Sequence, residues 1–166
     1  MIFDIKIREK HCVWGYFCIF AVEIQVENLL KIEYDMNINR DIYLKRLIDS
    51  RHNRMIKVVT GVRRCGKSYL LFHLFTDWLI AEGVADDHII TVNLEDRRNK
   101  SLRDPDNLLE YIDGRMMDKD MYYILLDEIQ MVDEFEDVLN SYLNVVNADV
   151  YVTGSNARFL SKDVIT

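Results

Sequence analysis

Hydrophobic positions along the chain fall into short apolar runs that alternate with longer stretches of helical spacing. The short runs are rich in β-branched and aromatic residues and predict buried strands at 55–60, 88–94, 121–126 and 149–153. In the longer stretches apolar residues recur every three or four positions, which predicts amphipathic helices at 38–54, 69–82, 105–116 and 133–146. Strands that alternate with helices indicate an α/β fold with a mostly parallel sheet.

Two of these helices carry start signals. Asp104 precedes Pro105, which predicts an N-cap followed by proline at the first helical position. Asp133 and Glu136 have the spacing of a capping box at the start of the last helix.

The first 35 residues differ from the rest of the chain in their pattern of apolar and charged positions. Residues 12–22 are apolar and follow basic positions, but this run is too short to span a bilayer and no small-residue cleavage site follows it. Residues 22–27 alternate like an amphipathic strand. We expect residues 1–35 to be an extension that is not native, with Met36 as the natural start. The alternative is an added edge strand or hairpin.

A phosphate-binding motif lies between the first predicted strand of the alternating region and the helix that follows. Gly61 to Ser68, GVRRCGKS, fits the pattern GxxxxGK[ST] at every fixed position. Glycine at 61 and 66 permits backbone angles that side chains disfavour, so that N–H groups can turn toward an anion at the start of a helix. The alternative interpretation is a glycine turn that only caps a helix.

The motif predicts a nucleotide site with distinct roles for two polar residues. Lys67 supplies a mobile charge for the β- and γ-phosphates, and the Ser68 hydroxyl is a ligand for Mg²⁺. The residues expected to bind ATP are Gly61, Val62, Arg63, Arg64, Cys65, Gly66, Lys67, Ser68 and Tyr69.

A second motif ends the strand at 121–126 with the acid pair Asp127 and Glu128. A strand buried on both faces is this apolar, and its carboxyl end brings the acids to the edge of the sheet beside the phosphate loop. We expect Asp127 to orient Mg²⁺ and Glu128 to act as general base on the attacking water. Paired acids also end strands by chance, so it is their position after a phosphate loop that indicates a catalytic role.

Charge is unevenly distributed along a chain whose formal net charge is -7. Residues 37–67 carry nine Lys or Arg against two Asp, whereas residues 82–149 carry eighteen acids against six bases. The basic block is either a solvated face that includes the phosphate site or a face for a protein or nucleic-acid partner. The cysteines, Cys12, Cys18 and Cys65, are odd in number and lack metal-ligand spacing, which favours a reducing, cytoplasmic setting.

The segments GVRRCGKS, LLDEIQ and VTGSN, in this order and with these gaps, resemble the AAA+ ATPase domain of a prokaryotic group usually called simply ATP-binding proteins. The resemblance covers about residues 36–166. It implies a three-layer P-loop NTPase fold with helices on both faces of a parallel five-stranded sheet, in which strand 149–153 lies between the two motif-bearing strands. Only four of those strands are found after Met55. The implied catalytic residues are Lys67, Glu128 and a sensor at Asn156, with Ser155 as the alternative sensor.

Members of that group typically continue into an arginine-bearing segment, a helical lid and a nuclease-like C-terminal domain, whereas this chain ends at Thr166. The resemblance therefore implies a core at 36–166 that is truncated before the lid, in which ATP binding can survive where turnover does not. The expected function is Mg²⁺-dependent ATP hydrolysis coupled to a protein partner, the absent C-terminal domain or nucleic acid, away from membranes and with the oligomeric state open.

Two alternative functions remain. One is a nucleotide-binding fragment without hydrolysis, and the other is a small-molecule kinase that uses the same loop. A kinase does not need Glu128 after the metal-binding Asp127, whereas an ATPase that activates water does.

Overall fold

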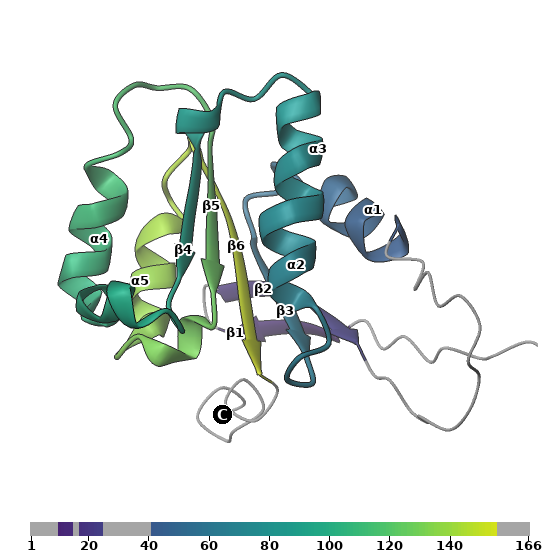
Figure 1. Ribbon diagram of the computed structural model, residues 1–166, viewed down its shortest axis with the longest axis horizontal. Helices are drawn as coiled ribbons and strands as arrows, with labels where there is room; N and C mark the ends of the chain where they lie inside the picture. Colours follow the sequence, from purple (N-terminus) through teal and green to yellow (C-terminus); the bar gives the residue numbers. More distant parts are fainter. Residues whose placement is uncertain (1–9, 15–16, 25–40, 156–166) are drawn as a thin grey trace, which may run out of the picture.

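The structure, a computed structural model, describes residues 10–14, 17–24 and 41–155, which form a six-stranded sheet with helices packed on it (Figure 1). The strands are β1 (Lys10–Trp14), β2 (Phe17–Ile24), β3 (Ile56–Gly61), β4 (Ile89–Asn93), β5 (Tyr122–Asp127) and β6 (Ala148–Ser155). Their order across the sheet is β1, β2, β3, β6, β5, β4, and every neighbouring pair is parallel except β1 with β2. The predicted α/β fold with a mostly parallel sheet is confirmed.

Strand β6 lies between β3 and β5, as the resemblance implied. Gly61 at the end of β3 is opposite Ser155, and Asn93 at the end of β4 is opposite Asp127. The carboxyl ends of the parallel strands therefore meet at one edge of the sheet, where ligands bind in open α/β folds.

The fifth parallel strand comes from the segment before Met55. β2 pairs with β3 over residues 19–24 and 56–61, and β1 folds back on β2 in antiparallel register. This arrangement corresponds to the alternative of an added hairpin, and the alternating segment 22–27 overlaps β2 only in part. The hairpin covers the edge of β3 that faces away from β6.

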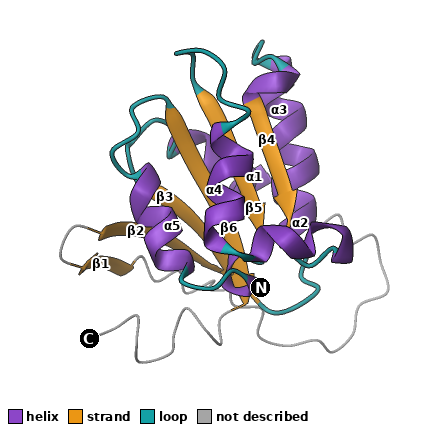
Figure 2. Ribbon diagram, turned by 90° about the vertical axis from the view of Figure 1, so that its left-hand side faces the viewer, coloured by secondary structure: helices purple, strands orange, loops and turns teal. Residues whose placement is uncertain are grey.

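Helices cover both faces of the sheet (Figures 1 and 2). One face carries α1 (Asp41–Asp49) and a continuous helix made of α2 (Lys67–Tyr69), the π-helical segment η1 (Leu70–Phe75) and α3 (Thr76–Ala81); the other carries α4 (Pro105–Asp113) and α5 (Phe135–Tyr142). Single turns of 3₁₀-helix form η2 (Asp86–His88), η3 (Arg97–Arg103, two merged turns) and η4 (Ile129–Met131). None of the described helices is long and apolar enough to cross a bilayer.

Successive strand residues serve the two faces in turn, as the pleat of a strand requires. Val58, Ile124 and Val152 belong to the core under α4 and α5. Val59, Leu125 and Tyr151 belong to the core under α1 and α3. The three-layer arrangement thus follows directly from strands that are apolar on both sides.

The two predicted helix starts have different outcomes. The N-cap at Asp104 is confirmed, because its carboxylate accepts a hydrogen bond from the backbone N of Asn107 at 3.0 Å. The capping box at Asp133 is wrong: α5 begins after Glu134, which is left-handed at φ 50° and makes no side-chain cap. The N–H of Asp133 instead donates to the carbonyl of Arg103 at 3.1 Å, so this residue is held by η3.

Two helix ends also differ from the prediction. α1 ends at Asp49, and the left-handed residues His52 and Arg54, at φ 55° and 61°, turn the chain into β3. Residues 38–40 of the predicted helix lie outside the described residues. α5 ends at Tyr142, so Val146, the last residue of the predicted helix 133–146, lies beyond it and is 79% exposed.

Candidate functional site

The phosphate loop joins β3 to α2 at the carboxyl edge of the sheet. Gly66 has φ 93°, which agrees with the conformational freedom expected there. The second left-handed residue is Arg64, at φ 66°, and not Gly61, which is the last residue of β3. A non-glycine residue in this region costs about 1 kcal/mol or more, so the surrounding loop must hold Arg64 in place.

Lys67 lies inside the loop with 4% of its surface exposed. Its Nζ donates to the carbonyl oxygens of Gly61 and Val62 at 3.2 and 3.3 Å. The same ammonium lies 3.7 Å from Oε1 of Glu128. The cation is therefore positioned between the loop backbone and the acid pair.

Ser68 and Asp127 meet directly at the end of β5. The Ser68 hydroxyl donates to Oδ2 of Asp127 at 2.8 Å, and the Thr153 hydroxyl donates to Oδ1 at 2.5 Å. Hydroxyl and carboxylate oxygens are the ligands that Mg²⁺ prefers, and these two adjoin the loop expected to bind phosphate. Ser68 and Asp127 therefore fit the metal-binding role predicted for them.

Glu128 is fixed both by its backbone and by its side chain. It is left-handed at φ 57°, and its N–H donates to the Thr153 hydroxyl at 3.0 Å. Its Oε2 accepts a hydrogen bond from Nε2 of Gln130, while Oε1 faces Lys67. With 14% of its side chain exposed, Glu128 keeps access to solvent at the mouth of the site.

Other predicted residues form the rim of the loop. Val62, Arg63, Arg64 and Tyr69 are exposed, and Cys65 carries a half-buried free thiol. Arg63 reaches out of the loop to Glu95 at 2.5 Å. Ser155 ends β6 with its Oγ 3.5 Å from Nε2 of Gln130, and Asn156 lies outside the described residues.

Asp96, next to Glu95 after β4, has a local role. Its carboxylate accepts hydrogen bonds from the side chain and the backbone of Arg98, which lower the pKa of Asp96 to about 2. This carboxylate caps η3.

Sequence reasoning missed the contacts of Thr153 and Gln130. Both lie within the quoted motifs, Thr153 in VTGSN and Gln130 two positions after Glu128 in LLDEIQ. A polar residue in an otherwise apolar strand is the signal that points to Thr153, which is fully buried.

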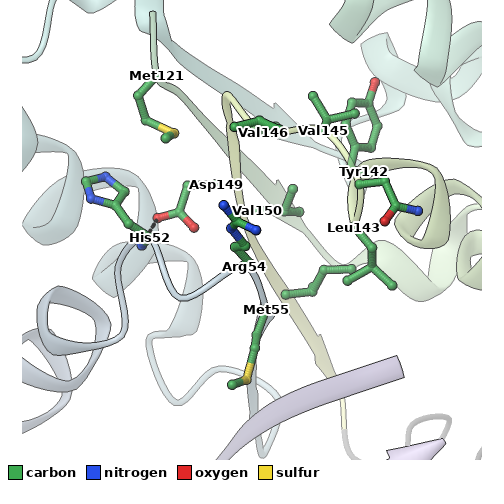
Figure 3. Close-up of a pocket in the computed structure, with 13 residues that line it drawn as sticks. His52, Arg54, Met55, Met121, Tyr142, Leu143, Val145, Val146, Asp149 and Val150 are labelled. Carbon is green, nitrogen blue, oxygen red and sulfur yellow. Dashed lines mark hydrogen bonds between the residues drawn. The ribbon is translucent and has the colours of Figure 1, made fainter. Parts of the chain in front are cut away.

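A second polar cluster occupies the amino edge of the sheet, opposite the phosphate loop. A cavity of about 380 Å³ opens there between the turn at 52–55 and the segment after α5, and Asp149 lines it (Figure 3). Asp149 forms a buried ion pair with Lys57 and accepts hydrogen bonds from the Tyr151 hydroxyl at 2.9 Å and the backbone N of His52 at 3.2 Å. Burial lowers the pKa of Lys57, although Asp149 opposes this effect.

Comparison with known proteins places this site in a family. The AAA domain family matches residues 53–166. An uncharacterized protein of Haemophilus influenzae is 35% identical over 130 residues, which are 78% of this chain and 32% of the relative. The uncharacterized protein MJ1544 of Methanocaldococcus jannaschii is 34% identical over 167 residues, which are 99% of this chain and 34% of the relative.

The chain therefore spans about a third of the length of these curated relatives. No solved structure matches it significantly. The family match covers the phosphate loop, the acid pair and β6. Since β6 lies between β3 and β5, the sheet order brings the phosphate loop beside the acid pair. The chain belongs to the AAA domain family of P-loop ATPase domains.

Proposed function

We propose that this chain binds Mg·ATP at the phosphate loop and hydrolyses it. The observation that best supports this proposal is that two contacts lie side by side. The Ser68 hydroxyl lies 2.8 Å from Asp127, and the Lys67 ammonium lies 3.7 Å from Glu128. A metal-binding pair and a phosphate-binding cation with a carboxylate beside it are the parts that ATP hydrolysis needs.

In this proposal the phosphates bind in the loop, and Lys67 exchanges two neutral carbonyl acceptors for anionic oxygens. Glu128 accepts a proton from water as the water oxygen bonds to the γ-phosphorus. The bond from that phosphorus to the bridging oxygen breaks, and ADP leaves with the electron pair. Ser68 and Asp127 would hold Mg²⁺, which would supply neutralisation of the negative charge on the phosphates. Asn156, or Ser155 in its place, orients the water.

The fixed position of Glu128 favours hydrolysis over the alternatives. Glu128 is fixed by Thr153 and Gln130 beside the loop, an arrangement that a pure binding module or a kinase does not require. We propose that hydrolysis drives or switches a partner, which is a protein, nucleic acid or a further domain of the kind that the longer relatives have room for. The odd cysteine count supports a cytoplasmic setting.

The experiment compares three substitutions by phosphate release and by calorimetric ATP affinity. Glu128→Gln keeps size and hydrogen bonding but cannot accept the proton, so binding should persist while turnover falls about 10² to 10⁴-fold. Asp127→Asn should weaken both Mg·ATP binding and turnover, because its metal ligand is weaker. Lys67→Ala should abolish binding and serves as the control for the loop.

Hydrolysis by Glu128→Gln at the parent rate would show that Glu128 is not the base. Tight binding by a parent chain that releases no phosphate would favour the non-hydrolysing alternative. Phosphate transfer that depends on an added acceptor would favour the kinase.

A further inference from the structure

We propose that Gln130 is a positioning residue for Glu128, whose carboxylate it holds by one oxygen so that the other is directed to the reacting water. This inference rests on the proposed ATP hydrolysis. It concerns a residue that lies outside the phosphate loop and is not an expected metal ligand; besides Glu128, its Nε2 lies 3.5 Å from Oγ of Ser155.

The backbone brings Gln130 back over Glu128. Glu128 follows the last residue of β5 in a left-handed conformation and precedes the 3₁₀ turn η4, in which the N–H of Met131 donates to the carbonyl of Glu128 at 3.0 Å. This tight reversal places the Gln130 amide against Oε2 of Glu128. Gln130 itself is only 8% exposed, so its side chain has little freedom to leave that position.

The two oxygens of Glu128 therefore have different neighbours. Oε2 is held by a neutral amide within the protein, whereas Oε1 lies 3.7 Å from the Lys67 ammonium. Lys67 is the cation expected to turn to the phosphates, which carry more charge than a single carboxylate. When Lys67 does so, Oε1 faces the reacting group, and Gln130 remains the contact that fixes the side chain.

A neutral donor suits this role. The Gln130 amide donates a hydrogen bond to a carboxylate oxygen without carrying a charge or a transferable proton of its own. Thr153 already fixes the Glu128 backbone through its N–H at 3.0 Å. Gln130 supplies the orientation of the side chain that a backbone contact cannot.

The test is a double-substitution cycle on phosphate release. Gln130→Met keeps the length of the side chain but removes the donor, and Gln130→Glu keeps its shape but places a second carboxylate beside Glu128. Each should lower kcat about 10- to 100-fold through misplacement of the base, while KM for ATP changes by no more than about twofold. In a Glu128→Gln background, Gln130→Met should cause no further loss, because the base that it positions is already gone.

Calorimetric ATP affinity and the far-ultraviolet circular dichroism spectrum of each variant show whether the site and the fold are intact. If Gln130→Met fails to fold, the kcat of Gln130→Glu tests the positioning role. Unchanged kcat in the folded variants would overturn the proposal. So would an equal additional loss in the Glu128→Gln background, or a loss of ATP affinity in step with kcat, since both indicate a general structural role. If the parent chain releases no phosphate, the proposed hydrolysis is wrong, and the inference that rests on it is wrong as well.

Discussion

At the scale of single residues, one hydroxyl holds the whole acid pair. Thr153 donates to Oδ1 of Asp127 and accepts from the N–H of Glu128, which uses both functions of a hydroxyl group. Thr153 is fully buried, so water cannot replace either bond. The positions of the two acids at the carboxyl end of β5 thus depend on a side chain of the neighbouring strand β6.

Thr153→Val should therefore distinguish the effect of the side chain's shape from the effect of its hydrogen bonds. Valine has nearly the same volume but leaves the Glu128 N–H without its acceptor, so we expect a loss of about 1 to 3 kcal/mol in the free energy of unfolding. Turnover should fall as well, because both acids lose a contact. Thr153→Ser keeps the hydroxyl and is the matched control. Denaturant unfolding and phosphate release measure the two effects, and equal values for the valine and serine variants would contradict this role.

At the scale of elements, the sequence predicts what local periodicity determines and misses what distant contacts determine. The four strands after Met55 are found because each is apolar on both faces. Asp104 and Asp133 carry similar cap signals, but only Asp104 acts as a cap, since Asp133 is held by η3 from far away in sequence. The nucleotide loop and the acid pair can be located from sequence, whereas the Thr153 contacts depend on strand pairing and the contact of Gln130 with Glu128 depends on the turn η4.

The pairing of β2 with β3 is a second contact that local patterns do not specify, and it changes what a deletion should do. Removing residues 1–35 takes away the strand that pairs with residues 56–61, so we expect the melting temperature to fall by about 5 °C or more and the chain to associate through the open edge. ATP affinity should persist, because the loop and acid pair are retained. Removing residues 1–9 leaves both strands and is the control. Equal melting temperatures for the two deletions would show that the hairpin adds no stability.

At the scale of the whole molecule, the sheet carries a polar cluster at each edge, and β3 and β6 contribute to both. The Lys57 and Asp149 pair joins these two strands at the amino edge. A buried pair of this kind need not stabilise the fold more than apolar residues would, but removing one partner typically costs about 3 to 5 kcal/mol. Changes at Asp149 should thus act on the fold as a whole.

The buried tyrosines make the fold sensitive to alkali. Burial, followed by a neighbouring carboxylate, raises the pKa of Tyr142 and of Tyr151, and burial raises the pKa of Tyr123. In the unfolded chain these hydroxyl groups lose their protons at about pH 10. Above that pH the native state therefore binds more protons than the unfolded state does. Their contribution to stability is therefore complete below about pH 10 and is lost as the pH rises further. Lys57, with its lowered pKa, acts with the opposite sign, but it is one group against three.

An alkaline titration followed by tyrosinate absorbance and circular dichroism together checks this expectation. The tyrosinate absorbance of Tyr123, Tyr142 and Tyr151 should appear only as the helical signal disappears. Tyr142→Phe should flatten the decline of stability with pH, relative to the parent. Complete ionisation of all tyrosines in a chain that keeps its helical signal would contradict the expectation.

The position of β6 between β3 and β5 also sets an order of assembly during synthesis. β3 leaves the ribosome with β2 already made, but its other neighbour is the last strand of the described chain. A nascent chain that ends before residue 148 holds every phosphate-loop residue and both acids, yet lacks the strand that brings them side by side. Because so distant a pairing closes the sheet, the nucleotide site is among the last features to form, and apolar strand edges stay exposed until it does.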